Sequence, residues 1–246
     1  PYPFGLPFGV KVEFVQNLRS GEYVYTNSGG AFSLQLGRKG KWYFGGGKET
    51  ITPTDHGDSL GIQHFKAQTF NIEYYSDGRN DRWLPSTGYF WYEKTQIGQV
   101  KETNKKDNII IRLQLHLEQF LSLSRNMSLR FKLWSGIVWD EGQEIHVGQK
   151  IRYGGINTLR GYQEDIFANG IINITSIDLL FTPNEHFQLF AFGDKAYQEI
   201  YDIPLSLGFG LRQRTENYVM EVSFGWPMDE AFSGGKVHVK FTSLLN

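Results

Sequence analysis

The segment IRLQLHLEQFLSL at residues 111–123 decides the fold class of this chain. Its leucines recur at almost every second position, and arginine, glutamine, histidine and glutamate occupy most of the positions between them. A helix would scatter these leucines around its circumference, whereas a strand places them on one face. The segment therefore predicts a long β-strand with one apolar face and one polar face.

The next segment, MSLRFKLW at residues 127–134, repeats this alternation after the turn-like sequence Ser124-Arg125-Asn126. The two segments predict a hairpin of long strands. Strands of soluble sandwiches usually have about 5 to 6 residues, whereas a tilted strand that spans a membrane needs about 9 to 11. Strand length therefore favours a membrane β-barrel over the alternative, a soluble sheet protein.

Similar alternation along the chain predicts an all-β fold with about twelve antiparallel strands. The predicted strands lie within residues 10–14, 32–36, 41–45, 70–74, 88–94, 111–123, 127–134, 171–181, 187–194, 205–212, 220–226 and 237–241. A closed barrel leaves no unpaired strand edge in lipid, where each unsatisfied backbone group would cost several kcal/mol. We therefore expect residues 1–246 to form a single transmembrane β-barrel domain, either alone or as the C-terminal part of a longer protein.

The composition agrees with a membrane barrel and narrows the functional classes. Aromatic residues make up 15% of the chain, glycine occurs 28 times and cysteine is absent. The net charge of -1 gives no reason to expect a nucleic-acid partner. The six histidines lack metal-ligand spacing and no Gly-x-Ser-x-Gly elbow occurs, so the sequence predicts no metal, no cofactor and no enzymatic activity.

One long connection, from Asp140 to about Gly170, breaks the rhythm of strands and short turns. Loops of this length are usually functional or disordered. This loop contains the sequence GGINTLRGY at residues 154–162. In bacterial outer-membrane barrels the long loops face the outside and the short turns face the periplasm, which gives an expected orientation.

The loop sequence resembles the Gly-Gly-x-x-Ser/Thr-hydrophobic-Arg-Gly-Phe/Tyr segment of the BamA/TamA-type outer-membrane insertase and translocator superfamily. Four further stretches resemble other elements of that family, in the same order along the chain: residues 84–88, 192–194, 208–212 and 234–238. The resemblance implies that the loop folds back into the barrel lumen ahead of the last four strands, and we count four strands after it. The chain departs from relatives, which usually have about sixteen strands, by its smaller strand number and by the lack of periplasmic repeat domains.

The arginine of the motif allows a physical prediction. A guanidinium inside a barrel loses bulk hydration and needs charge-assisted partners, preferably carboxylates. Asp178 and Asp194 are expected on consecutive strands, both facing the lumen. Our hypothesis is that Arg160 pairs with Asp194 and Asp178 and pins the loop to the inner wall; the alternative is an exposed loop arginine. The predicted loop-anchoring motif comprises Gly154, Gly155, Leu159, Arg160, Gly161 and Tyr162.

The resemblance also implies a location, partners and a role. It predicts an outer-membrane protein of a Gram-negative bacterium that inserts or translocates polypeptides without a cofactor. The expected partners are outer-membrane lipid, a polypeptide client or passenger, and periplasmic or lipoprotein components, with self-association if the barrel is truncated. The alternative function is a passive pore, or a membrane anchor for a separate passenger such as a patatin-like domain.

Glycines near the closing strands suggest how such a barrel would open. We predict that they weaken a seam between the first and last strands, which would then pair with incoming strands at its edges. An equally open interpretation is that they accommodate barrel curvature. These glycines are Gly208, Gly210, Gly234 and Gly235.

Overall fold

Long antiparallel strands dominate the computed structural model, which describes residues 8–19, 21–36, 40–100, 108–141, 144–198 and 204–244. The strands of the main sheet are β1 (Phe8–Arg19), β2 (Tyr23–Leu36), β3 (Gly40–Pro53), β4 (Phe65–Asp77), β5 (Gly88–Val100), β6 (Asn108–Ser122), β7 (Met127–Asp140), β10 (Ile171–Asn184), β11 (Phe187–Gln198), β12 (Leu205–Arg214), β13 (Tyr218–Pro227) and β14 (Lys236–Ser243). Short elements in the connections are α1 (Asp55–Ser59), η2 (Val147–Gln149), β8 (Ile151–Tyr153), β9 (Phe167–Asn169) and η3 (Phe232–Gly234). Within these described ranges, no helix is long and apolar enough to cross a bilayer.

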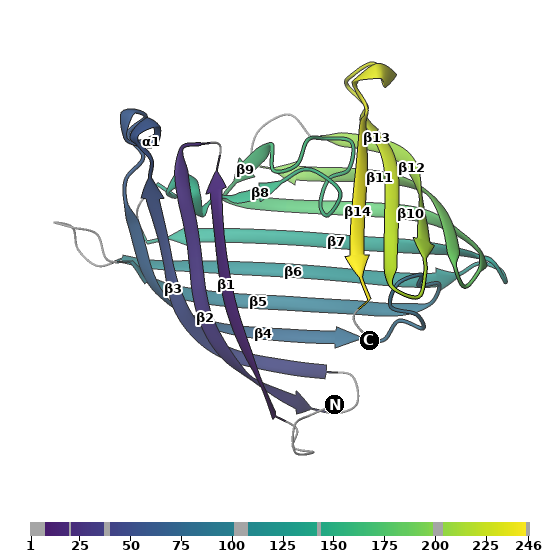
Figure 1. The fold of residues 1–246 in the computed structure, drawn as a ribbon, viewed down its shortest axis with the longest axis horizontal. Coiled ribbons are helices and arrows are strands. Elements are labelled where there is room, and N and C mark those ends of the chain that lie inside the picture. The colour runs from purple at the N-terminus through teal and green to yellow at the C-terminus, as the bar shows by residue number, and fades with distance from the viewer. Residues whose placement is uncertain are drawn as a thin grey trace. The chain divides into compact units, whose positions relative to one another are not determined.

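Within the described residues, the main sheet contains twelve strands, and each is hydrogen-bonded to its neighbours in chain order. Figure 1 labels these strands. The order has a single irregularity, since β7 lies next to β10. The intervening strands β8 and β9 form a separate two-stranded sheet inside the long loop. Each strand predicted from the sequence coincides with an observed strand, and only the segment 111–123 runs past its strand, by one residue at the end of β6; this confirms the all-β prediction and the strand number.

The number of strands that we counted after the long loop is wrong. We counted four strands after the long loop, although five of the predicted segments lie after residue 170; the structure has five strands there, from β10 to β14. The first of them, β10, begins at Ile171, directly after the loop. Its burial alternates from Ile171 to Phe181 and it pairs with β11, so it is a strand of the main sheet and not part of the loop.

The chain divides into two compact units, each of which takes in part of the long strands. The first unit comprises Pro1–Ser76, Tyr92–Gln114 and Ile137–Lys150. The second comprises Asp77–Trp91, Leu115–Gly136 and Ile151–Asn246. In both, the face of the sheet on which the long loop packs is called the inner face below, and the opposite face is called the outer face.

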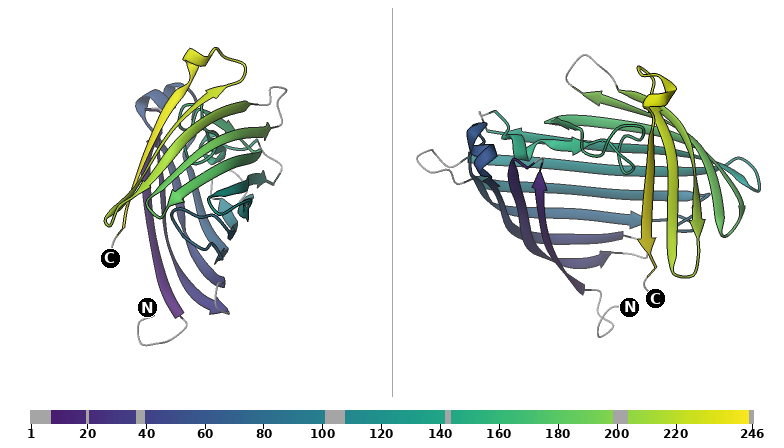
Figure 2. Two further views of the ribbon diagram at one scale, coloured as in Figure 1. Left: turned by 90° about the vertical axis from the view of Figure 1, so that its right-hand side faces the viewer. Right: turned by 45° about the horizontal axis from the view of Figure 1, so that its top comes forward.

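In the first unit, the outer face of β1 is strongly apolar. Phe8, Val10, Val12 and Phe14 are more than half exposed, with Val12 at 81%. Such a surface is unfavourable in water and suits contact with lipid chains. The strands β2 and β3 of this unit curve along their length (Figure 1; Figure 2, right).

The inner face of the first unit is apolar where the loop covers it. Tyr23 and Ile51 are each 1% exposed, and both lie against Gly148 of the loop, where a side chain in place of hydrogen would collide with them. The alternation in the sequence predicts a polar inner face. The difference has a physical reason, because a wall that is covered by a loop is removed from water and gains from apolar packing.

In the second unit, strand β10 shows the alternation most clearly. Ile177 and Leu179 are exposed on the outer face, whereas Asp178 and Leu180 are fully buried on the inner face. A cluster of buried apolar side chains forms the core of this inner face. It consists of Phe120, Leu180, Phe190 and Phe192.

Candidate functional site

The long loop enters the second unit as a small hairpin, in which β8 pairs with β9. Its tip begins at Gly154 and Gly155, whose φ angles of 119° and 84° lie in the region that glycine adopts most easily. Thr158 closes the turn because its hydroxyl accepts a hydrogen bond from the Gly154 amide at 2.9 Å and donates one to the Gly154 carbonyl at 2.8 Å. This local geometry delivers residues 159–162 to the inner face of the sheet.

Arg160 forms the centre of the site. It is 2% exposed, and its guanidinium lies between Asp178 of β10 and Asp194 of β11, both fully buried. Nε and Nη2 donate to the two oxygens of Asp194 at 2.8 and 2.5 Å. Nη1 and Nη2 donate to the two oxygens of Asp178 at 3.1 and 2.8 Å. The backbone amide of Arg160 also donates to Asp194 at 3.0 Å, so the loop is attached through its main chain as well as its side chain.

The site is close to electrically balanced. Arg130 of β7 donates to Asp178 at 2.6 Å, so two guanidinium groups face two carboxylates. The Arg160 guanidinium also lies 3.6 Å above the ring centroid of Phe192, a distance suited to a cation–π contact. Next to it, Lys132 donates to the carbonyl of Asn157 at 2.7 Å. Burial of this many charges is tolerable only because each charge has a partner of opposite sign or a hydrogen bond.

The residues beside Arg160 fix the loop tip against the last strands. Gly161, with φ 89°, approaches the backbone of Gly225 on β13 so closely that a Cβ would lie 3.0 Å from it. The Gly161 amide donates to Nε2 of His238 on β14 at 3.2 Å. Leu159 is fully buried.

Tyr162 completes the tip. Its hydroxyl donates to the carbonyl of Leu205 at 3.4 Å and lies 3.5 Å from Asp229, and its ring meets Phe167 edge-on. Burial and the nearby carboxylate of Asp229 raise the pKa of Tyr162 to about 12. The phenol therefore stays protonated and keeps its donor role at neutral pH.

A second arginine cluster holds the loop in the first unit. Arg112 of β6 donates to Gln149 of η2 and to Gln96 of β5 at 3.2 Å, and it pairs with Glu49 of β3 at 3.4 Å. Gln149 and Glu49 are 2% and 1% exposed. The loop thus has an anchor on each side of residue 150, one supplied by a wall arginine and one by its own arginine.

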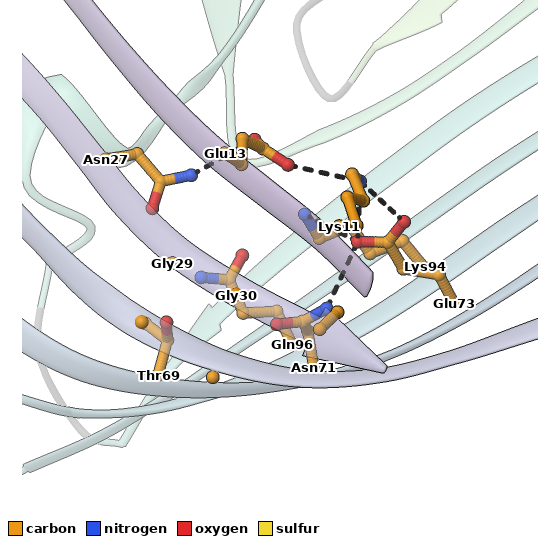
Figure 3. Close-up of a pocket in the computed structure, with 13 residues that line it drawn as sticks. Lys11, Glu13, Asn27, Gly29, Gly30, Thr69, Asn71, Glu73, Lys94 and Gln96 are labelled. Carbon is orange, nitrogen blue, oxygen red and sulfur yellow. Dashed lines mark hydrogen bonds and ion pairs between the residues drawn. The ribbon is translucent and has the colours of Figure 1, made fainter. Parts of the chain in front are cut away.

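The first unit also contains a polar pocket, shown in Figure 3, which adjoins this cluster through Gln96. Glu73 lines this pocket and pairs with Lys11 at 3.0 Å and with Lys94 at 3.2 Å. Lys11 lies on β1 and Glu73 on β4, with β2 and β3 between them. The pocket floor is made by glycines of β2 and β3, including the facing pairs Gly29–Gly47 and Gly30–Gly46. The missing side chains on these two strands leave room for the ion pair to cross them.

The structure brings Arg160, Asp178 and Asp194 together, with Ser176 and Gln188 buried on the same face as the two aspartates. The four glycines that were predicted to weaken a seam between the first and last strands are not part of this arginine–aspartate cluster. Gly208 and Gly210 lie on β12, where the rings of Phe192 and Phe190 fill the space of a Cβ, and Gly234 and Gly235 precede β14.

The sequence analysis missed three contributors to the site. Arg130 and Lys132 share the polar face of their strand in the sequence. The alternation therefore predicts which face of the sheet they occupy, but it does not predict which residues they contact. The contact of His238 with the loop had no signal, because it joins residues that are 77 positions apart. Among the described residues, no group of histidine and acidic side chains is arranged to hold a metal ion.

A twelve-stranded antiparallel sheet with an apolar outer face, and a loop pinned by arginine to its inner face, defines a membrane β-barrel with an internal loop. Comparison with known proteins agrees. The chain belongs to the Omp85 superfamily, because the sequence profile of the Omp85 superfamily domain matches residues 6–178. This confirms the family that the loop motif predicts. A search of curated proteins finds no match.

Solved structures support the fold. The chain is similar to BamA from Haemophilus ducreyi lacking POTRA domains 1–3, with a TM-score of 0.73 and 13% identity over 96% of this chain and 59% of that chain. It is also similar to CdiB from Acinetobacter baumannii, with a TM-score of 0.57 and 10% identity over 86% of this chain and 40% of that chain. The chain therefore spans about half the length of these two solved proteins, and at such identities the likeness concerns the fold.

Proposed function

We propose that this chain is an outer-membrane barrel of a Gram-negative bacterium that mediates the insertion or translocation of polypeptides. The observation that carries the proposal is the buried Arg160 cluster, which fixes the long loop to the inner face through two bidentate carboxylate contacts. Membership of the Omp85 superfamily supports the same role. Residues 1–246 would act as one barrel domain.

The proposed role involves no covalent chemistry and no cofactor. The anchored loop would shape the inner face along which a client polypeptide passes. An incoming strand would form backbone hydrogen bonds with the edge of an end strand of the sheet, β1 or β14. Outer-membrane lipid would cover the apolar outer face, and periplasmic or lipoprotein components would deliver the client.

The test compares client insertion with passive conductance. The purified chain is reconstituted in liposomes, and the folding of an unfolded outer-membrane barrel client is followed by its heat-modifiable mobility on gels. We expect faster client folding than in empty liposomes, and slower folding with Arg160→Ala. Arg125→Ala, in the turn between β6 and β7, is the control because Arg125 is exposed and lies outside the loop-anchoring cluster.

Two results would overturn the proposal. One is client folding at the same rate with and without the chain. The other is steady ion conductance in planar bilayers combined with no effect on the client, since this would assign the chain as a passive pore or an anchor for a separate passenger domain.

A further inference from the structure

A cavity of about 280 Å³ lies on the inner face of the second unit, beside the loop between β4 and β5. Both the wall strands β6, β7 and β12–β14 and that loop contribute to its lining. Five of its side chains are cationic, whereas only two are carboxylates, Glu118 and Glu221. The cationic residues are Arg79, Arg82, Arg130, Arg212 and Lys240.

Three of the five cations already have carboxylate partners. Arg79 pairs with Asp77 at 2.7 Å, Arg130 with Asp178 at 2.6 Å and Arg212 with Glu221 at 2.7 Å. These pairs form part of the wall. They do not account for the remaining positive charge of the cavity.

The other two cations form no salt bridge among the described residues. Within the described part of the chain, Arg82 forms no ion pair, and its guanidinium lies 5.0 Å from the ring centroid of Trp83. Lys240 donates to the amide oxygen of Asn157 at 2.8 Å and forms no salt bridge within that part of the chain, although the carboxylate of Glu164 interacts with it electrostatically. A concave surface with unneutralised charge of one sign concentrates ligands of the opposite sign.

A buried donor in the same cavity is also unused. Arg130 is only 8% exposed, and its Nε makes no hydrogen bond to any described residue. A buried donor without a partner has an energetic cost, and the cost is larger when the donor is charged. A ligand oxygen that enters the cavity would remove this cost.

We propose that this cavity binds carboxylate side chains of an acidic polypeptide segment, a proposal that rests on the polypeptide-handling role given above and names a class of client. The free donors are of the kind that bind anions, and Arg82 offers a planar fork that matches a carboxylate. Glu118 and Glu221 repel a doubly charged phosphate about twice as strongly as a carboxylate. Trp83 supplies apolar surface for the chain that flanks the acidic residue.

The test measures peptide binding to the purified full chain in detergent micelles, by the fluorescence anisotropy of a labelled peptide that contains several aspartates. A second peptide carries asparagine at the same positions. We expect the aspartate peptide to bind at least about tenfold more tightly. Its affinity should fall with added salt, because the contacts are ionic, whereas inorganic phosphate should compete no better than acetate.

Arg82→Gln provides the site-specific arm, with Arg125→Gln as the matched control. Both residues are exposed arginines in turns of the second unit, but only Arg82 lines the cavity. Arg82→Gln should weaken binding of the aspartate peptide about threefold to tenfold, after allowance for the exposure of Arg82, while Arg125→Gln should not change it. Native folding of each variant is verified by its heat-modifiable mobility.

Equal affinity for the two peptides would overturn the proposal, and so would equal effects of the two substitutions. Displacement by phosphate at lower concentrations than acetate would reassign the cavity to phosphate groups. Because binding is measured without a client, selective binding combined with failed client insertion would remove the proposed function and leave the cavity assignment in place. Successful client insertion combined with unselective peptide binding would remove only the cavity assignment.

Discussion

Arg160 is a buried charge whose removal should destabilise the chain, although buried ion pairs do not in general stabilise a protein more than apolar packing would. Replacing a whole buried ion pair by apolar groups often leaves the stability unchanged, but removing a single partner leaves the other charges buried without a counter-charge. In Arg160→Ala, Asp194 would lose its only guanidinium partner among the described residues, and Asp178 would keep Arg130. We expect the free energy of unfolding to fall by about 3–5 kcal/mol. Thermal unfolding in detergent and limited proteolysis of the long loop measure the effect.

Arg160→Lys separates the role of the charge from that of the fork. A lysine keeps the positive charge but cannot bind two carboxylates in bidentate fashion. It should therefore recover only part of the loss caused by Arg160→Ala. Full recovery would show that a point charge suffices, and an unchanged unfolding temperature and protease pattern in Arg160→Ala would contradict the anchoring role.

Gly161 poses a backbone requirement that is independent of charge. Its φ of 89° and the 3.0 Å distance from an ideal Cβ to Gly225 both oppose a side chain. A left-handed conformation alone costs a non-glycine residue about 1–2 kcal/mol, so Gly161→Ala should lower the unfolding temperature clearly. The control is Gly193→Ala on β11, where a Cβ would meet only the flexible end of Leu207. Equal effects of the two substitutions would speak against the close contact at the loop tip.

At the level of the strands, the glycines of β2 and β3 do two things at once. They bring the backbones of the two strands close together, and they leave the floor on which Lys11 reaches Glu73 (Figure 3). A Cβ at Gly47 would lie 2.4 Å from the carbonyl oxygen of Ser28, whereas a Cβ at Gly30 would meet nothing nearer than 3.7 Å. Gly47→Ala should therefore destabilise the chain by about 1–3 kcal/mol, and Gly30→Ala should be nearly neutral. Chemical unfolding of both variants decides this, and equal stability of the two would refute it.

The loop between β4 and β5 depends on Asp81 in a pH-sensitive way. Partial burial alone would raise the pKa of Asp81, but backbone hydrogen bonds from Leu84 and Trp83 and the ion pair with Arg214 outweigh burial and hold it below the ordinary value of 3.8. The stabilisation is fully present above the ordinary value and is lost as the pH falls through the lower pKa of the folded state. We expect wild type to unfold at a higher temperature than Asp81→Asn at neutral pH, and the gap to close in strong acid.

Asp58→Asn is the control for this pH series, since Asp58 is exposed on α1 and the substitution removes the same charge. Its difference from wild type should be smaller at neutral pH. A gap for Asp81→Asn that stays constant from neutral pH into strong acid would exclude an ionic contribution of Asp81.

The strands could be predicted wherever apolar and polar residues alternate along the local sequence. All twelve strands of the main sheet were located, but β2 and β3 extend well beyond the predicted segments. The reason is that the glycines at 29–30 and 45–47 interrupt the alternation without interrupting the hydrogen bonds to the neighbouring strand. The strands β8 and β9 were missed because three residues are too few to show a period of two.

The site was predictable only in part, for a similar reason. Alternation assigned Asp178 and Asp194 to one face, and the motif supplied Arg160 as their partner. The cluster of Arg112 with Glu49 and Gln149 joins three elements that are remote in sequence, so neither periodicity nor motif spacing could indicate it.

For the whole molecule, we predict that the loop anchors keep the ion conductance low. The loop is attached at Gln149 by a wall arginine and at Arg160 by wall carboxylates, so two points of the loop are held on the inner face. If the loop fills the path through the barrel, wild type should pass little current in planar bilayers, and Arg160→Ala should show larger or more frequent openings because the tip is released. Arg125→Ala should behave as wild type, since Arg125 lies in a turn away from the loop-anchoring cluster. Identical currents for wild type and Arg160→Ala, in preparations whose loop is shown by proteolysis to be released, would mean that the loop anchors the wall without controlling the path.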